Sequence, residues 1–384
     1  MTRALFVNSG MAGHRTFARL MKQVVDLIPG LAAEHLDLSG DLTPLDRVVR
    51  RVFSFPFAPK TGPLANLDLR RWREEVNVGL LAARRIAQAE RRGGFDLLHF
   101  YTQPAAYASI SRMKRVPAIV CLDSTPHLAS LETESQLSRS SYYANVLHDG
   151  RVFRAAAAIV ATSAWAANDL AASYPDCASK VTMLPIPIDL ASFPAEWADE
   201  RAARARLAGY RPRVLFIGSD FPRKGGPDLL DAWREGGLAG VAELELVTDW
   251  PLAAEALPPG VTLTRGVAAY SDRWRELWRR ADVYVMPTRH EAFGIVYQEA
   301  AASGIPAIGS DISAVPEIIL DGATGCLVRP RDRAGLARAL RALIDSAELR
   351  SRMGLAAREH VSRQAALPVY AAGLNSIIES VMHK

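Results

Sequence analysis

The stretch from Ala281 to Pro330 constrains the fold more than any other part of the chain. An apolar run at 283–286 predicts a strand, a short loop with an acidic residue follows, and a helical pattern then ends near Gly304. A strand, a loop and a helix in this order are typical of parallel α/β proteins. Since the start of a helix favours anionic oxygens, this stretch predicts a site for a phosphorylated ligand.

Two glutamates in this stretch have seven residues between them. Glu291 precedes the expected helix start at Phe293-Gly294-Ile295, and Glu299 lies inside the helix, about two turns further on and near the same face. Carboxylates on either side of a phosphate site can accept hydrogen bonds from ligand hydroxyls. The pattern suggests a nucleotide sugar, while a solvated helix glutamate at Glu299 and a helix-capping acid at Glu291 stay open as alternatives.

Apolar runs alternate with helical patterns along the chain, which predicts two parallel-sheet domains of the α/β class. In residues 1–192 we expect strands at 4–8, 96–100, 118–122, 157–161 and 181–184. A proline-rich stretch at 185–194 predicts the hinge. In residues 193–364 we expect strands at 213–218, 244–248, 261–264, 283–286, 307–309 and 325–327. A last helical pattern covers 368–382.

The residues around the two glutamates, EAFGIVYQEA, ASGIPAIGSD and VPEIILDGATGCLV, resemble the retaining glycosyltransferases of family 4. The resemblance is strongest from Val214 to Pro330 and weaker over residues 1–195. It implies the GT-B fold, in which two Rossmann-like domains face a cleft, with residues 1–192 on the acceptor side and 193–364 binding the nucleotide sugar. It also implies that residues of about 365–384 cross back onto the first domain, and that no metal or other cofactor is bound.

The resemblance assigns roles to four residues of the donor site. Glu299 matches the family acid that accepts bonds from the ribose hydroxyls, and Glu291 matches the acid near the reacting carbon of the donor sugar. Lys224 and Arg223, on the loop after the strand at 213–218, match the place of the cations on the diphosphate leaving group. The backbone N–H groups of Phe293, Gly294 and Ile295 would meet phosphate at the helix start.

Two positions depart from the family pattern. Ser219 stands where many relatives have an arginine, and Arg223, which adjoins Lys224, is the candidate to replace that charge. Asp123 stands where many relatives have a histidine that contacts the donor sugar, so this carboxylate either binds a sugar hydroxyl or caps a turn. The expected function is transfer of a sugar from a nucleoside-diphosphate sugar to a hydroxyl of a glycan, polysaccharide or glycolipid. A sugar-nucleotide epimerase and a catalytically weak scaffold subunit stay open as alternatives.

Acceptor or cleft residues are harder to choose in the first domain. Gly13 and His14 lie on the loop after the first strand, and Gln103 and His127 follow later strands, so these four are the candidates. His99 lies inside an apolar strand and is expected to be structural. The glycines near residue 10 do not complete G-x-G-x-x-G, which disfavours a nicotinamide dehydrogenase.

The charge and the cysteine content limit the partners and the cellular compartment that the sequence predicts. The net charge is +5, and residues 1–180 hold 22 Lys and Arg against 16 Asp and Glu, too modest an excess to predict nucleic-acid binding. Three scattered cysteines and the lack of a secretory pattern at the start predict a cytoplasmic location. The mixed basic and aromatic stretch RVVRRVFSFPF at 47–57 either contacts an anionic membrane peripherally, at its inner face, or packs on the first domain.

Overall fold

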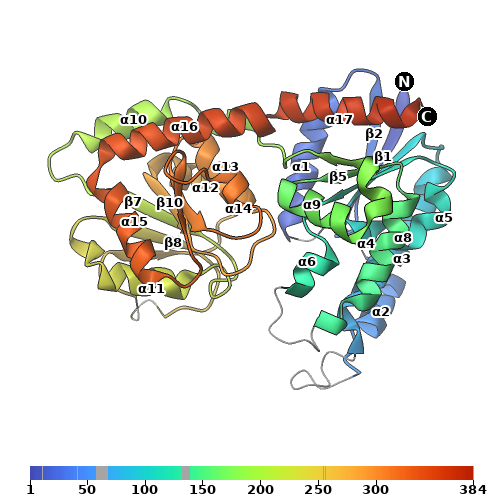
Figure 1. Ribbon diagram of the computed structural model, residues 1–384, viewed down its shortest axis with the longest axis horizontal. Helices are drawn as coiled ribbons and strands as arrows, with labels where there is room; N and C mark the ends of the chain where they lie inside the picture. The colour runs from blue at the N-terminus through green and yellow to red at the C-terminus, as the bar shows by residue number, and fades with distance from the viewer. Residues whose placement is uncertain are drawn as a thin grey trace. The chain divides into compact units, whose positions relative to one another are not determined.

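The chain forms two compact units. The structure, a computed structural model, describes residues 1–10, 12–40, 42–57, 68–131, 139–253, 255 and 257–383, and not the side chains of residues 12–14. The N-terminal unit comprises Met1–Pro187 and Leu367–Lys384, and the C-terminal unit comprises Ile188–Ala366 (Figure 1). The sequence placed these boundaries a few residues away, after residues 192 and 364.

A six-stranded parallel sheet forms the centre of the N-terminal unit, in the order β2-β1-β3-β4-β5-β6. Three of the strands, β3, β4 and β5, are short and wholly buried because helices cover the sheet. The edge strand β2 was not predicted from the sequence. The strands are β1 (Thr2–Asn8), β2 (Leu31–Asp37), β3 (Leu97–Tyr101), β4 (Ala118–Leu122), β5 (Ala158–Ala161) and β6 (Val181–Met183).

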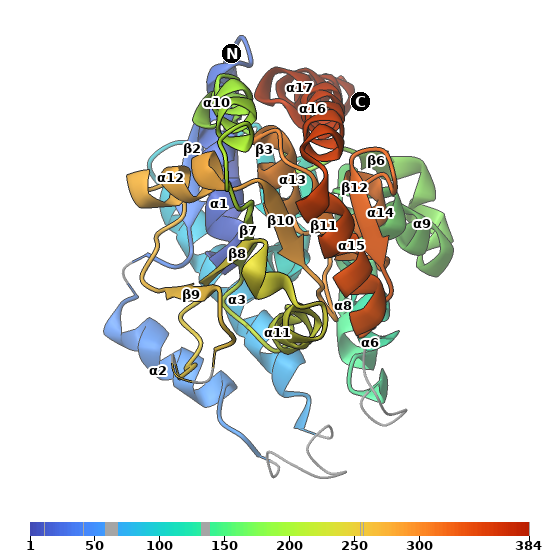
Figure 2. The same cartoon turned by 90° about the vertical axis from the view of Figure 1, so that its left-hand side faces the viewer.

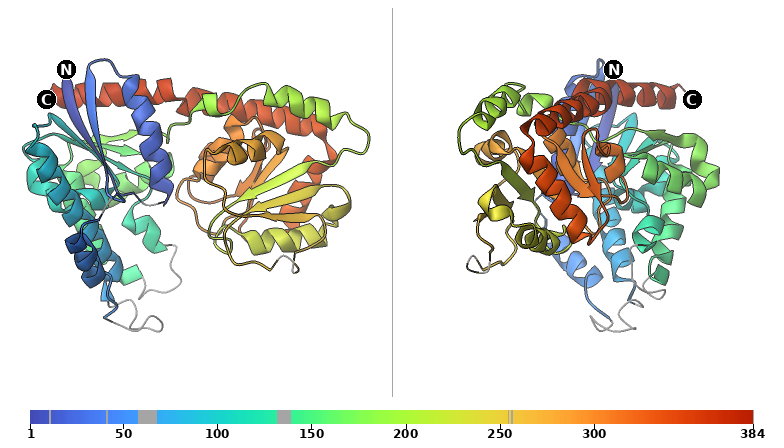
Figure 3. Two further views of the ribbon diagram at one scale, coloured as in Figure 1. Left: turned by 180° about the vertical axis from the view of Figure 1, so that it is seen from behind. Right: turned by 60° about the vertical axis from the view of Figure 1, so that its left-hand side comes forward.

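Helices pack on both faces of this sheet. α17 lies beside α1 (Figure 3). The ring of Tyr370 meets that of Phe17 edge to face, with 6.4 Å between the ring centroids. Residues of α3 and α8 contribute to the core cluster with β3 and β4. The helices are α1 (Ala12–Asp26), α2 (Pro44–Phe53), α3 (Arg70–Glu90), α4 (Gln103–Ala106), η2 (Tyr107–Ser109), α5 (Ile110–Met113), α6 (Pro126–Leu131), α8 (Tyr143–Ala155), α9 (Ala164–Ser173), η3 (Pro175–Lys180) and α17 (Leu367–Met382).

A second six-stranded parallel sheet forms the centre of the C-terminal unit, in the order β12-β11-β10-β7-β8-β9 (Figure 2). The prediction of two parallel-sheet α/β domains is therefore confirmed. The strands are β7 (Arg213–Ile217), β8 (Glu243–Val247), β9 (Val261–Thr264), β10 (Val283–Met286), β11 (Ala307–Ser310) and β12 (Gly325–Val328).

Right-handed crossovers place α11 and α13 on opposite faces of this sheet, because the chain leaves β7 and β10 in opposite directions. α11 packs against α15, whereas α13 packs against α14 and α16. The helices are η4 (Leu190–Ser192), α10 (Trp197–Ala205), α11 (Gly226–Glu235), η5 (Leu238–Gly240), α12 (Asp272–Arg280), α13 (Ile295–Ala302), α14 (Val315–Ile318), α15 (Arg333–Asp345) and α16 (Ala347–Ala365). Across the described helices, none has the length and apolarity needed to span a bilayer.

Each sheet has a switch point, where the chain reverses its direction of travel across the strands. It lies between β1 and β3 in the first sheet and between β7 and β10 in the second. Ligands of open parallel sheets bind outside the carboxyl ends of the strands at such points. The loops after β7 and β10 approach each other there, since a Cβ on Gly225 would lie 1.8 Å from the carbonyl oxygen of Pro287.

Replacing Gly225 by alanine tests this close approach. The residue has a φ of +76°, so Gly225→Ala adds backbone strain to a clash with the Pro287 backbone. We expect a loss of about 3 kcal/mol or more in the free energy of unfolding, measured by urea denaturation. Gly209→Ala is the matched control, because Gly209 has a φ of +71° in open space and should lose only about 1 kcal/mol. Equal losses for both variants would contradict the proposed loop contact.

Candidate functional site

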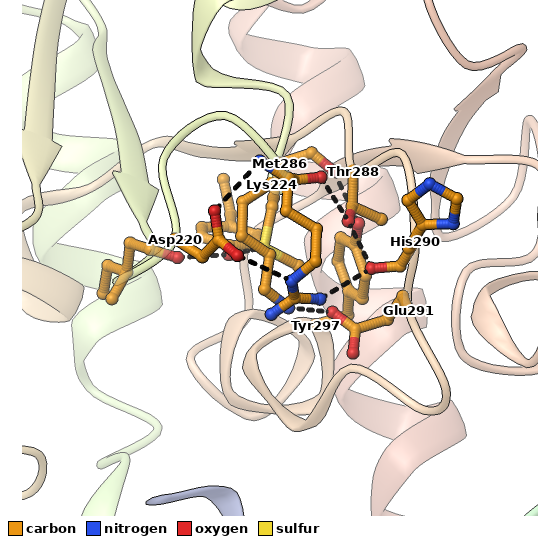
Figure 4. A network of polar contacts seen from close by, with 10 residues as sticks. Asp220, Lys224, Met286, Thr288, His290, Glu291 and Tyr297 are labelled. Carbon is orange, nitrogen blue, oxygen red and sulfur yellow. Dashed lines mark hydrogen bonds and ion pairs between the residues drawn. The ribbon is translucent and has the colours of Figure 1, made fainter. Parts of the chain in front are cut away.

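The loops at residues 218–225 and 287–294 form one hydrogen-bonded substructure at the second switch point. The backbone N–H of Arg289 donates to the carbonyl oxygen of Arg223 at 2.8 Å. The guanidinium of Arg223 donates to the carbonyl oxygen of His290 at 2.8 Å and also pairs with Asp220 at 3.1 Å. The imidazole of His290 points away from these contacts (Figure 4). Arg223 is thus oriented by both loops.

Lys224 and Glu291 form an ion pair across the two loops (Figure 4). Their side chains are only 13% and 12% exposed, so the pair is shielded from most of the solvent. The ammonium is therefore neutralised by a carboxylate from the same site. Ser219, where the sequence departs from the family pattern, is exposed on the first loop.

The start of α13 is shaped by Gly294 and Tyr297. Gly294 is the N-cap with a φ of +89°, and a Cβ there would lie 2.6 Å from the Tyr297 ring. The Tyr297 hydroxyl donates to the carbonyl oxygen of Met286 at 2.5 Å, and burial raises the pKa of this phenol well above its usual value. The hydroxyl therefore stays a donor that ties the helix start to the end of β10. The first N–H groups of α13 have no acceptor within the helix.

Glu299 lies in the middle of α13 and is 4% exposed. Glu291, in contrast, lies in the loop, because α13 begins only at Ile295. The prediction that Glu291 precedes the helix start and that Glu299 lies inside the helix agrees with the structure. Because residues 291–294 are loop, helical spacing does not apply to the pair as a whole. Phe293, which precedes the N-cap, has a buried side chain, so it would act on a ligand through its backbone.

Two of the candidates in the N-terminal unit line one cavity of about 200 Å³ at the ends of β3 and β4. They are Gln103, which is buried and donates to the carbonyl oxygen of Ser124 at 2.9 Å, and Asp123. His127 does not line this cavity. Its Nδ1 lies 2.6 Å from Asp169 Oδ1, with the side chain 46% exposed.

The other first-domain predictions have varied outcomes. Gly13 and His14 fall in the first turn of α1, and their side chains lie outside the described residues. His99 is structural as predicted, since it is 1% exposed and stacks on Phe6 at 4.7 Å, and burial lowers its pKa to about 3. Sequence reasoning missed Glu75 and Asp149, which line the same cavity as Gln103 from helices α3 and α8.

Among the residues that the structure describes, no group of three or more histidine, cysteine, aspartate or glutamate side chains lies together in a way that could hold a metal ion.

Two family models match the chain. Residues 211–346 match the model for glycosyl transferases group 1, and residues 41–192 match the model for glycosyltransferase family 4. The chain belongs to the family 4 glycosyltransferases. The matched ranges cover most of both units, and the two loops that carry Lys224 and Glu291 lie inside the first range.

Curated relatives of this family 4 chain are also glycosyltransferases. The D-inositol 3-phosphate glycosyltransferase of Streptomyces avermitilis is 31% identical over 244 residues, covering 56% of this chain and 50% of that protein. A protein of the same name from Arthrobacter sp. is 26% identical over 348 residues, covering 83% and 80%. The glycogen synthase of Mycobacterium tuberculosis is 42% identical over 86 residues, covering 22% and 21%. The chain thus spans about half the length of the Streptomyces relative, and less of the mycobacterial one.

Solved structures establish the GT-B fold. A sucrose-phosphate synthase from Thermosynechococcus elongatus has a TM-score of 0.72 at 17% identity, with all of both chains covered. HepE from Anabaena, in complex with UDP and glucose, has a TM-score of 0.67 at 15% identity, covering 99% of this chain and 100% of that one. At such identities the likeness concerns the fold alone.

A double-mutant cycle measures the strength of the Lys224–Glu291 pair. Lys224→Met or Glu291→Gln alone leaves a shielded charge without its partner, so each should lower the free energy of unfolding by about 1–3 kcal/mol. The double variant should lose less than the sum, with a coupling of about 1–2 kcal/mol by urea denaturation. The exposed pair Asp272–Arg275 serves as the control and should couple by less than about 0.5 kcal/mol. A coupling no larger than that of the control would contradict a shielded pair.

Proposed function

We propose that this family 4 member transfers a sugar from a nucleoside-diphosphate sugar to a hydroxyl acceptor, with retention of the anomeric configuration. The observation that carries the proposal is the gathering of Lys224, Glu291 and the start of α13 at the switch point between β7 and β10. Cations and helix N–H groups suit a diphosphate, and the carboxylates suit hydroxyls. Structures of HepE in complex with UDP and with UDP-glucose support a nucleotide-sugar donor for this fold.

Each residue of the C-terminal site has a part in donor binding under this proposal. Lys224 and Arg223 face the diphosphate, together with the backbone N–H groups of the segment from Phe293 to Ile295, which includes Gly294. Glu299 accepts from the ribose hydroxyls, and Glu291 from the hydroxyls of the donor sugar. Because Lys224 is paired with Glu291 in the unliganded protein, a phosphate oxygen would take over the place of the carboxylate at the ammonium.

The proposed reaction is a front-face displacement in which the diphosphate departs from the sugar carbon. Lys224, Arg223 and the helix start stabilise the negative charge that develops on the leaving oxygen. That oxygen accepts the proton of the attacking acceptor hydroxyl on the same face, so the configuration is retained. Glu291 stabilises the positive charge of the transition state. In this scheme the protein's own cations serve the leaving group, and no metal is required.

A carbohydrate or glycolipid acceptor follows from the same proposal. Asp123 and Gln103 line the cavity at the ends of β3 and β4, the edge of the first sheet where a ligand would bind. Asp123 offers a carboxylate to a sugar hydroxyl at the position where many relatives have a histidine.

Calorimetric titration with UDP, GDP, ADP, dTDP and CDP in the presence of EDTA tests the donor site. We expect one nucleotide to bind best, and Glu299→Gln to weaken it by about tenfold to a hundredfold because charged hydrogen bonds to the ribose are lost. Glu235→Gln, at the exposed end of α11, should bind like the wild type. If no nucleotide binds any of the three proteins, the proposal fails and a scaffold subunit becomes the better interpretation. Once an acceptor is identified, proton NMR of the product would show whether the anomeric configuration of the transferred sugar is retained.

Peripheral contact with an anionic membrane is a second proposal, supported by α2. Its Leu45, Val48 and Val52 fall on one face at helical spacing and are 58%, 60% and 58% exposed. Asp46 lies on the opposite side of the helix. Its carboxylate accepts a hydrogen bond from the backbone N–H of Thr43, the N-cap, and pairs with Arg84 of α3 at 2.9 Å. Three exposed arginines of the same helix, Arg47, Arg50 and Arg51, supply positive charge for anionic headgroups.

Flotation with lipid vesicles tests the α2 surface. The wild type should float with phosphatidylglycerol vesicles and remain in the soluble bottom fraction with phosphatidylcholine vesicles. Val48→Asp/Val52→Asp should lose most of the floating fraction, because two charges are placed on the apolar face. Leu207→Asp/Leu355→Asp alters two equally exposed leucines of the C-terminal unit and should float normally. Failure of the wild type to float with anionic vesicles would contradict the proposal.

A further inference from the structure

A pair of carboxyl groups lies beneath the cavity of the N-terminal unit. Glu75 of α3 and Asp149 of α8 both approach the phenol of Tyr107, whose Oη is 2.5 Å from Asp149 Oδ1 and 3.1 Å from Glu75 Oε2. A phenol has one proton and can donate it to only one of these carboxylates. Both contacts are hydrogen bonds only if a second proton resides on the pair.

The electrostatics of the pair agree with this proton count. Burial raises the pKa of Asp149 well above its usual value, and the neighbouring Glu75 carboxylate raises it further. Burial also raises the pKa of Glu75, although Arg71 opposes the rise. Two carboxyl groups close together in a low dielectric do not both ionise easily. The pair therefore holds a proton that a bound cation would displace.

One buried oxygen atom beside the pair, Asn145 Oδ1, lacks a hydrogen-bond donor, and Asn145 is 1% exposed. The amide nitrogen of Asn145 donates to Glu75, which orients its oxygen away from that carboxylate. The Asp149 carboxylate, also 1% exposed, interacts with the side chains of Tyr107 and Gln103. Buried acceptors are nearly always satisfied in folded proteins, so the Asn145 oxygen indicates a missing donor.

The cavity that Asn145 and Asp149 line is acidic. Its described lining includes the carboxyl groups of Glu75, Asp123 and Asp149 against the single cation of Arg71. This guanidinium is 4.0 Å from Glu75 and lies over the ring of Tyr142 at 4.6 Å, to whose hydroxyl it also donates.

The neighbouring histidine of α8 adds no compensating charge. His148 stacks on the ring of Tyr107 at 3.9 Å, and burial lowers the pKa of its imidazole. The cavity therefore keeps an excess of negative charge at neutral pH.

We propose that this cavity binds the protonated amine of a ligand. An ammonium offers three donors, enough for Asp149 and Asn145 together, and its charge replaces the proton held by the acid pair. A hydroxyl offers one donor and no charge, and so satisfies this arrangement less well. The interpretation of the ligand as an acceptor that carries an amino group rests on the proposed function, whereas the amine site itself does not.

Titration with three sugars that differ in one substituent tests the amine site. Glucosamine, glucose and N-acetylglucosamine present an ammonium, a hydroxyl and a neutral amide at the same carbon. At about pH 6.5, where an amine is protonated, glucosamine should bind at least about tenfold more tightly than either analogue. Its heat of binding should differ between buffers of different ionisation enthalpy, corresponding to release of about one proton. Equal binding of the three sugars, or no binding by any, overturns the proposal.

Variants locate the binding in this cavity. Asp149→Asn and Glu75→Gln should each abolish the preference for glucosamine and the release of the proton, with thermal unfolding used to verify that each variant is folded. Glu74→Gln is the matched control, because it removes the same charge one residue away on α3, where Glu74 pairs with Arg70 at 2.9 Å and is 43% exposed. A preference that survives both cavity variants, or that the control also loses, overturns the proposal.

The nucleotide titration separates this inference from the proposed function. Nucleotide binding depends on Lys224, Glu291 and Glu299 of the C-terminal unit, and the sugar titration uses no nucleotide. Loss of nucleotide binding with an intact glucosamine preference would refute the proposed function alone. The reverse result would refute the amine site alone.

Discussion

The C-terminal site depends on the close approach of two loops, at Gly225 and Pro287, which are joined by the hydrogen bond from the Arg289 N–H to the carbonyl oxygen of Arg223. Lys224 directly precedes Gly225, and Glu291 lies in the same loop as Pro287, so the ion pair forms only while the two loops stay close. The Tyr297 hydroxyl extends the same constraint to the start of α13. A sheet alone would bring the ends of β7 and β10 side by side, but the contact sets which side chains meet there.

The two units handle buried charge in opposite ways. In the C-terminal unit a cation meets an acid, since Lys224 pairs with Glu291. In the N-terminal unit two acids, Glu75 and Asp149, meet at one phenol. In each unit the charge is partly neutralised by another group of the protein, Glu291 for Lys224 and a shared proton for Glu75 and Asp149. In our proposals a ligand replaces that carboxylate or that proton. Affinity at both places would then reflect an exchange of partners rather than the full strength of the new contacts.

Buried parallel strands were predicted well because each is a short continuous apolar run, as in β4 and β10. The edge strand β2, LAAEHLD, is half exposed and carries polar residues, so it has no such run. Glu291 and Glu299 were singled out by motif, and the helix start predicted at Phe293-Gly294-Ile295 agrees with α13, whose N-cap is Gly294. Glu75 and Asp149 are far apart in the sequence on two helices, and no local pattern indicates that they meet.

The N-terminal unit is interrupted in the sequence by the whole C-terminal unit. Its core is completed by α17, where Tyr370 is 1% exposed and packs on Phe17. During synthesis, residues 1–187 therefore emerge without the helix that covers α1, and they receive it only after residues 188–366 have been translated. At the ends of this insertion, the N–H of Ile188 donates to the carbonyl oxygen of Ala365 at 2.8 Å. A folded insertion thus brings its own ends together and lowers the chain entropy lost when α17 docks.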